Sequence, residues 1–363
     1  MKINPDRLKG LLRRMTDIYS PSGKEEELLL FLCGYLSEKG YTFIRQPVSD
    51  GRFNIIVTPE RKEAPLALVG HLDTVFAYDF DEYGFKERRG KIQGLGVADM
   101  KSGCAAMIEA FTRYLEAERA HPTAALALVV GEEENSDGAM KLLEEYRFKT
   151  AVIGEPTEMV PCFGHYGYIE MELRLSGLRR HASLSGTARN APYSMLKVLL
   201  SAVSYLGSFS GKVRYNIRDL HSSDSGFSVP EKCSVWLDIH VHPEIKIRSF
   251  VSGIKKRIRQ YVKGLDIKNR DVHINVEDYP GYKMNPQWPG FKKIHRALEK
   301  NGLSGKTGLF ESHSDANIMR LRNVKPIILG PGKLAKAHTK DESISFSQVK
   351  KASQTYLDLI SLI

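Results

Sequence analysis

Cysteine is scarce in this chain, and long apolar runs are absent. The 363 residues include only 4 cysteines, and none of them stands in a Cys-x-x-Cys pair. This spacing excludes a disulfide framework and a cysteine zinc knuckle, so any metal site must use histidine and carboxylate ligands. No apolar run approaches the roughly 20 residues of a membrane span. The N-terminal stretch MKINPDRLKG also lacks the apolar segment of a secretory signal. We therefore expect a cytoplasmic protein with no membrane partner.

Charge is plentiful but unevenly distributed. Hydrophobic residues make up 42% of the chain and charged residues 26%, an ordinary mix for a globular protein of two domains. The formal net charge is +10, and residues 170–283 hold 19 Lys and Arg against 11 Asp and Glu. A basic surface attracts nucleic acid or an acidic substrate. The basic residues are not interleaved with aromatic ones, however, as in proteins that bind single strands. A solvated helix face explains the charge more simply, and we expect no nucleic-acid partner.

The N-terminal region has the periodicity of two helices. Apolar residues recur at helical spacing between residues 5 and 19. After a Ser-Pro-Ser-Gly turn, Ser22 stands where a helix cap is expected, ahead of a second helix that ends at Gly40.

Three near-continuous apolar runs predict strands that are buried on both faces, as in an α/β sheet. They cover residues 66–70, 124–130 and 151–153, and polar side chains follow each run. Open α/β sheets bind ligands just beyond the carboxyl ends of their strands. These side chains can therefore meet in space although they are distant in sequence. They are His71 and Asp73, Glu132 and Glu133, and Glu155.

Histidine and carboxylate residues also supply a candidate set of metal ligands. Zinc binds imidazole and carboxylate groups where cysteine is not used. Two neighbouring ions need a shared carboxylate, and Asp99, in a glycine-containing loop ahead of a helix, is the natural bridge. Taken singly, each residue has an ordinary alternative, such as a surface histidine, a helix cap or a turn residue. Their placement at three strand ends favours the metal site. The five candidates are His71, Asp99, Glu133, Glu155 and His338.

The middle of the chain has a different character. Residues 169–175, 233–241 and 272–276 alternate between apolar and polar, as half-exposed strands do. Helical patterns at 192–205 and 245–262 lie between these strands, which together indicate a small α+β domain. A helix at 291–301, an apolar run at 324–329, His338 and a closing helix then indicate a return to the first domain.

Six segments of the chain carry a recognisable pattern. They are Gly70–Val75, Gly94–Gly103, Glu132 and Glu133 with Gly138, Gly154–Thr157, Ser314–Asn317, and Ala337–Thr339. In this order they resemble the co-catalytic di-zinc peptidase and deacylase family, which includes glutamate carboxypeptidase, acetylornithine deacetylase, succinyl-diaminopimelate desuccinylase and peptidase T. The resemblance covers nearly the whole chain.

The resemblance implies an α/β fold of the zinc-exopeptidase kind. A mixed-sheet catalytic domain would comprise residues 1–165 and 285–363, and an inserted α+β lid and dimerisation domain would comprise residues 166–284. The lid would join two copies into a homodimer. The cofactors would be two Zn²⁺ ions, with Co²⁺ or Mn²⁺ as substitutes.

The resemblance also implies roles for the site residues. One zinc ion would be held by His71 and Glu155, the other by Glu133 and His338, and Asp99 would bridge them. Asp73 would orient the imidazole of His71. Glu132 would be the general base that takes a proton from a metal-bridged water and passes it to the leaving amine, which leaves Glu134 as an exposed spare carboxylate. His181, in the lid, would reach the active site of the partner subunit and stabilise the oxyanion.

Two positions depart from the carboxypeptidase pattern. Where those enzymes carry an Asn and a substrate-binding Arg, this chain has Phe227 and His240. Since histidine lacks the bidentate fork of arginine, a grip on the substrate α-carboxylate at this point is in doubt. Arg179 and Arg180, beside His181, are an alternative anion grip.

The reaction that we expect is hydrolysis of an amide or peptide bond in a short peptide or an N-acyl amino acid. One alternative is release of an amino acid from an acidic carrier protein, which the basic lid would suit. An alternative of another class is an inactive binding protein that keeps the fold. The presence of every expected ligand and of Glu132 argues against it.

Overall fold

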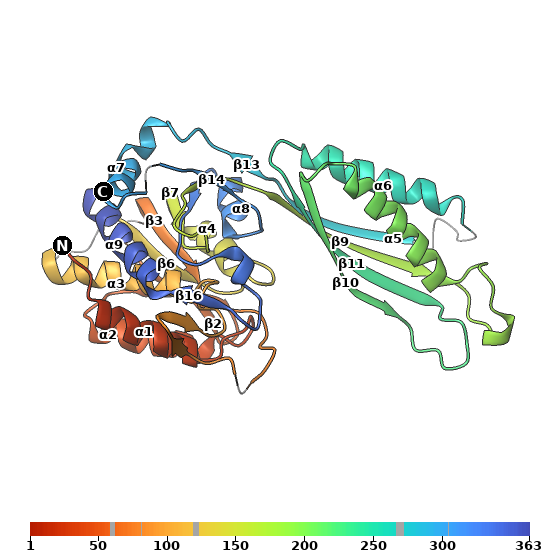
Figure 1. Cartoon of the computed structure of the whole chain (residues 1–363), viewed down its shortest axis with the longest axis horizontal. Coiled ribbons are helices and arrows are strands. Elements are labelled where there is room, and N and C mark those ends of the chain that lie inside the picture. The colour runs from red at the N-terminus through yellow and green to blue at the C-terminus, as the bar shows by residue number, and fades with distance from the viewer. Residues whose placement is uncertain (59–61, 81, 119–122, 266–271, 304) are drawn as a thin grey trace. The chain divides into compact units, whose positions relative to one another are not determined.

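The computed structural model describes residues 1–58, 62–80, 82–118, 123–265, 272–303 and 305–363 (Figure 1). The chain divides into two compact units. The first comprises residues 1–164, 284–310 and 314–363, and the second comprises residues 165–283 and 311–313. His165 and Met284 thus fall one residue away from the expected boundaries, and residues 311–313 join the second unit, which the sequence did not indicate. Within the second unit, the ring of His165 stacks on that of Tyr282, with the ring centroids 5.6 Å apart.

The first unit is built on a large mixed sheet, with strands in the order β1-β2-β6-β3-β7-β15-β8. Strand β3 lies parallel to β6 and to β7, β7 lies parallel to β15, and β2 runs antiparallel to β6. Strand β14 also pairs with β8. The three expected buried strands are therefore adjacent, in the order β6-β3-β7. The bounds are β1 Ile44–Ser49, β2 Arg52–Val57, β3 Glu63–His71, β6 Ala125–Val129, β7 Arg147–Ile153, β8 Cys162–His165, β14 Gly308–Phe310 and β15 Lys325–Ile328.

Seven α-helices of the first unit are described. Helix α1 lies where the apolar period predicted a helix, and its apolar residues are buried at helical spacing. Asn4 caps this helix and Pro5 is its first residue. In Figure 1, α1, α3 and α9 form one layer beside the strands, and these three helices pack on one another. The bounds are α1 Pro5–Asp17, α2 Glu26–Glu38, α3 Lys101–Glu118, α4 Asp137–Glu145, α7 Lys292–Lys300, α8 Asp315–Leu321 and α9 Phe346–Leu362.

The expected cap of α2 is wrong. The N-cap residue is Glu25, which makes no side-chain capping bond. Ser22 instead donates its hydroxyl hydrogen to the carboxylate of Asp73 at 2.6 Å. A buried carboxylate is the stronger acceptor here, since a charged partner shortens and strengthens a hydrogen bond.

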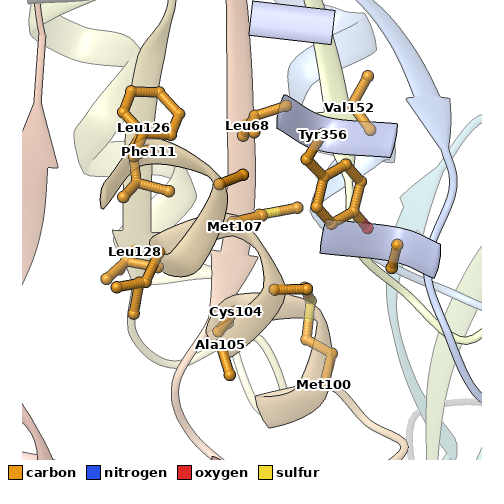
Figure 2. Close-up of a cluster of buried hydrophobic side chains, with 14 of the residues drawn as sticks. Leu68, Met100, Cys104, Ala105, Met107, Phe111, Leu126, Leu128, Val152 and Tyr356 are labelled. Atoms are coloured by element: carbon orange, nitrogen blue, oxygen red, sulfur yellow. The ribbon is translucent and has the colours of Figure 1, made fainter. Parts of the chain in front are cut away.

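The core of this unit lies between α3, α9 and the central strands. Figure 2 shows Met107 and Phe111 of α3 beside Leu68, Leu126 and the neighbouring strand residues. All of them are buried. Helix α3 comes very close to the end of β7, because a Cβ atom on Gly103 would lie 2.5 Å from the carbonyl oxygen of Gly154. This approach brings the loop that precedes α3 to the carboxyl ends of the strands.

The second unit is a four-stranded antiparallel sheet, in the order β10-β11-β9-β12, covered by α5 and α6. Alternate residues of β9, Ile169, Met171, Leu173 and Leu175, are buried with the apolar faces of both helices. The expected α+β character of this region is therefore present. The bounds are β9 Gly167–Ser176, α5 Ala191–Gly207, β10 Val213–Ser222, β11 Lys232–Val241, α6 Ile247–Val262, β12 Val272–Tyr279 and β13 Tyr282–Lys283.

A small third sheet, in the first unit, has the order β16-β5-β4. Its strands are β4 Lys86–Arg88, β5 Lys91–Gln93 and β16 Ser343–Ser345. None of the helices in the described part of the chain has the length and hydrophobicity that a bilayer crossing requires.

Candidate metal centre

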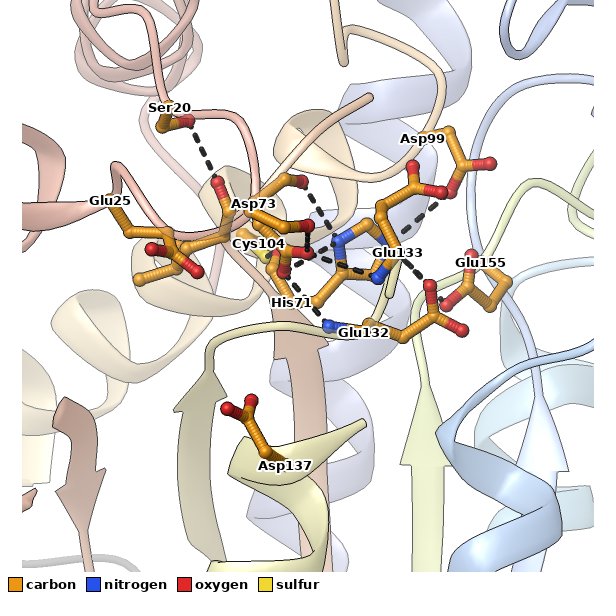
Figure 3. A network of polar contacts seen from close by, with 12 residues as sticks. Ser20, Glu25, His71, Asp73, Asp99, Cys104, Glu132, Glu133, Asp137 and Glu155 are labelled. Carbon is orange, nitrogen blue, oxygen red and sulfur yellow. Dashed lines mark hydrogen bonds and ion pairs between the residues drawn. The ribbon is translucent and has the colours of Figure 1, made fainter. Parts of the chain in front are cut away.

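The polar side chains that follow the central strands meet at one edge of the large sheet. His71 ends β3, Glu132 and Glu133 follow β6, and Glu155 follows β7. Because these three strands are parallel neighbours, their carboxyl ends lie together, as Figure 3 shows. Asp99, the candidate bridge, reaches the same place from the loop before α3.

Donor atoms form two groups that share Asp99. His71, Asp99 and Glu155 offer one set of mutually close ligand atoms, and Asp99, Glu133 and His338 offer another. The Nε2 atom of His71 lies 3.3 Å from Oδ1 of Asp99, whereas Nε2 of His338 lies 3.6 Å from Oδ2. The two carboxylate oxygens of Asp99 therefore face different histidines, which is the arrangement that a bridging ligand requires.

The histidines differ in exposure. The side chain of His71 is 1% exposed, and its Nε2 lies 3.7 Å from Oε1 of Glu155. The side chain of His338 is 48% exposed, and its Nε2 lies 2.9 Å from Oε1 of Glu133. One side of the cluster is thus closed by protein, and the His338 side is open to solvent.

Glu132 lies within the same cluster. Its Oε2 is 3.9 Å from Nε2 of His71, and the residue is buried. Donor atoms of His71, Glu132 and Glu133 form a third close group. Proximity alone therefore does not separate a base from the ligands. Glu134, by contrast, is exposed, as expected.

Crowded acidic groups leave this cluster short of positive charge. Burial, together with the neighbouring carboxylates, raises the pKa of Glu132 well above its ordinary value, and burial and Asp99 do the same for the pKa of Glu155. Burial lowers the pKa of His71, but hydrogen bonds to Asp73 and Asp99 outweigh it, so the pKa is raised. Oε1 of Glu155 is buried without a hydrogen bond among the described residues. A set of imidazole and carboxylate donors that includes a buried oxygen without a hydrogen bond fits divalent cations.

The buried side chain of Asp73 binds the loop that carries Glu132 and Glu133. Its carboxylate accepts the backbone N–H groups of Glu132 at 3.2 Å and Glu133 at 3.0 Å, as well as the hydroxyl of Ser22. Burial alone would raise the pKa of Asp73, but the hydrogen bond with His71 and its positive charge lower it below the ordinary value. The Nδ1 atom of His71 lies 3.0 Å from the carbonyl oxygen of Asp73, so the other ring nitrogen faces the ligand cluster.

Residues 67–362 match the sequence model of peptidase family M20/M25/M40. The chain belongs to this family. The expected resemblance and enzyme class, hydrolases of peptide or linear amide bonds, are thereby confirmed.

Individual relatives of this M20-family protein have diverse names. An Aspergillus fumigatus protein named "Probable carboxypeptidase" is 26% identical, over 99% of this chain and 87% of the relative. An acetylornithine deacetylase of Vibrio campbellii is also 26% identical, over 87% of this chain and 85% of the relative. The solved structure of a tripeptidase from Staphylococcus aureus has a TM-score of 0.81 at 22% identity and covers 99% of this chain and 98% of its own. The expected fold, a mixed-sheet domain with an inserted α+β domain, is confirmed.

The expected lid residues lie in the second unit. His181 is exposed, and its Nδ1 lies 2.7 Å from the hydroxyl oxygen of Ser183. Phe227 is 88% exposed. His240, on β11, lies with its ring 5.3 Å from that of Tyr168, and burial lowers its pKa. Burial thus disfavours the charged form of this imidazole, whereas the guanidinium of an arginine would stay charged.

Two buried acidic residues near the centre were given no role by the sequence, although Asp315 lies in the recognised segment Ser314–Asn317. Asp315, at the start of α8, is 2% exposed, and burial raises its pKa to about 7. Glu342 is 3% exposed and accepts hydrogen bonds from the loop that carries Asp99. Only its position four residues after His338 could have drawn attention to it.

Proposed function

We propose that this M20-family protein is a two-zinc hydrolase of short peptides or N-acyl amino acids, with Glu132 as general base. The observation that carries the proposal is the pair of three-donor groups that share Asp99 beside the buried carboxylate of Glu132. His71 and Glu155 would hold one ion, Glu133 and His338 the other, and Asp99 both. Zinc suits these nitrogen and oxygen donors, and Co²⁺ or Mn²⁺ would substitute.

Bound zinc ions supply polarisation of the scissile carbonyl and a lowered pKa for the attacking water. The protein's own contribution is proton transfer. Glu132 takes one proton from the attacking water and delivers it to the nitrogen of the leaving amine, so that the amide C–N bond breaks as the carboxylate product forms. Its buried position near His71 supports this role, because a base must be close to the reacting water.

Asp73 fixes the orientation of His71 and of the loop that carries Glu132. Its backbone carbonyl accepts from Nδ1–H of His71, which leaves Nε2 free to bind a metal ion. Its carboxylate holds the two adjacent amides at Glu132 and Glu133. The base and a ligand are therefore positioned by one side chain.

We further propose a homodimer formed by the second unit, in which His181 completes the partner's active site. Exposed apolar side chains on α5 support such an interface, since Leu196 is 54% exposed and Leu200 is 71% exposed. Light scattering should give the mass of two chains, and Leu200→Glu should shift it toward one. If His181 acts across the dimer, a mixture of the inactive variants Glu132→Gln and His181→Ala should recover part of the activity.

A carrier-bound substrate is favoured by one feature. Arg248, Lys255, Lys256 and Arg259 of α6, with Lys263 at its C-terminal cap, line an open groove of about 660 Å³. Among the described residues that line this groove, Asp278 is the acidic one. Such a groove would accept an acidic protein segment.

A hydrolysis screen of the zinc- or cobalt-loaded protein tests the proposal. The panel comprises N-acetyl, N-succinyl and γ-glutamyl amino acids with di- and tripeptides. We expect turnover of one class, and a decrease in kcat of about 100- to 10,000-fold in Glu132→Gln. Glu134→Gln, an exposed neighbour, is the matched control and should keep full activity. Two bound ions with no turnover would direct the search to carrier-bound substrates, whereas a protein that binds no metal would refute the proposal.

A further inference from the structure

The loop from Gly94 to Asp99 turns sharply before α3. Gly94 and Gly96 have φ angles of 150° and 76°, which favour glycine. A Cβ atom on Gly96 would lie 2.5 Å from the Cγ2 atom of Thr74. The turn points the N–H groups of Gly96, Ala98 and Asp99 toward one place, where successive amides form a pocket for an anion.

The carboxylate of Glu342 occupies that place. One oxygen accepts from Gly96 at 2.9 Å, and the other accepts from Ala98 at 2.7 Å and from Asp99 at 3.1 Å. Its backbone carbonyl also accepts from the N–H of Gly94 at 3.3 Å. Three of the four bonds thus depend on the side chain, and one of them ends on the backbone of Asp99 itself.

Glu342 belongs to the segment that also carries His338. The N–H of Glu342 bonds to the carbonyl of Thr339 at 3.1 Å, which closes a turn between the two residues. Directly after Glu342, β16 pairs with β5, with Ser343 opposite Gln93. The two loops that present Asp99 and His338 are therefore joined by one buried carboxylate and by the small sheet beside it.

We infer that Glu342 is a positioning residue that holds Asp99 and His338 at the distance that the shared metal site requires. The inference rests on the proposed function, because it takes these two residues as ligands. Without the carboxylate, three inward-pointing N–H groups lose their acceptor, and the loop would turn toward water or toward another partner. Since Asp99 belongs to both donor groups, a displacement of this loop would weaken the binding of both metal ions.

Three variants grade the effect. Glu342→Ala removes every acceptor of the side chain. Glu342→Gln keeps one acceptor oxygen but places an amide NH₂ group opposite the remaining N–H. Its metal affinity should therefore lie between those of the wild type and of Glu342→Ala. The matched control is Glu109→Gln, because Glu109 is also buried and accepts the backbone N–H of Asn4 at 2.7 Å, on the α1 side of α3.

Titration of the metal-free protein with Co²⁺, followed by its visible absorption and against a competing chelator, gives affinity and ligand geometry without any substrate. We expect two ions in the wild type, affinities about 10- to 100-fold weaker in Glu342→Ala with an altered spectrum, and a smaller loss in Glu342→Gln. Glu109→Gln should bind as the wild type does. Circular dichroism establishes that each variant is folded.

The outcomes separate the two proposals. Wild type that binds two ions, beside folded Glu342 variants with unchanged affinities and spectrum, would overturn the inference and leave the proposed function intact. If Glu342→Ala does not fold, Glu342→Gln alone decides, and unchanged binding there has the same meaning. Wild type that binds no cobalt would refute the proposed function, and the inference with it.

Discussion

Asp73 offers the sharpest test of how this centre is built. Its carboxylate is completely buried and accepts three hydrogen bonds, from the N–H groups of Glu132 and Glu133 and from the hydroxyl of Ser22. Asp73→Ala removes the acceptor of all three donors and also the charge beside His71, which lies 3.5 Å away. The N–H of Glu132 and the hydroxyl of Ser22 are buried, and the N–H of Glu133 is partly buried.

The expected cost follows from those three donors. A buried donor without a partner costs about 1–3 kcal/mol. Loss of the acceptor for three donors should therefore lower the free energy of unfolding by about 3–6 kcal/mol, because water can hydrogen-bond to some of these donors. The lowered pKa of Asp73 also means that its carboxylate stabilises the folded protein, because folding favours the ionised form. This contribution is present above the ordinary pKa of aspartate and is lost as the pH falls through the lowered value.

Urea unfolding of the metal-free protein measures the loss, and hydrogen exchange locates it. Amides of the loop that contains Glu132 and Glu133 should lose protection in Asp73→Ala, while those of β9 in the second unit keep it. Ser22→Ala should cost about 1–2 kcal/mol, and the double variant should cost less than the sum, since the two side chains share one bond. A loss no greater than that of the exposed Asp50→Ala would refute the reasoning.

Three further predictions concern the same unit. Phe111→Ala should cost about 3–5 kcal/mol by opening a cavity in the core of Figure 2, and a thermal melt that matches wild type would contradict this. Gly131→Ala should cost at least about 1–2 kcal/mol, because its φ is 75° and the new Cβ would lie 2.0 Å from Oδ1 of Asp137; urea unfolding checks it. The metal-free protein should become less stable as pH rises from 5.5 to 8.5. Burial raises the pKa of Asp315 to about 7, so the folded state retains a proton that the unfolded state has already released. Burial lowers the pKa of His338, but the hydrogen bond with Glu133 outweighs it and the pKa is raised to about 9. The stability that protonated His338 contributes is therefore lost as the pH rises toward 9. A urea midpoint that increases over this range would be the contrary result.

The central strands could be predicted because their apolar runs are continuous. Strands β3, β6 and β7 are buried along nearly their whole length, which leaves a clear signal in the sequence. The edge strands β1 and β10 did not stand out, because most of their residues are exposed and do not alternate. Helix α8 has only 7 residues, too few for a helical period to emerge.

The sequence by itself determined which chemistry this protein could hold. Histidine and acidic side chains stand directly after buried strands, and cysteine ligands are excluded, so the donor set was readable without coordinates. Only the tertiary structure decided how those donors are held. Ser22 binds Asp73 rather than capping a helix, and Glu342 binds the loop of Asp99 from 243 positions further along the chain. Such partnerships have no sequence period, because they join loops that become neighbours only after the sheet and its helices have packed.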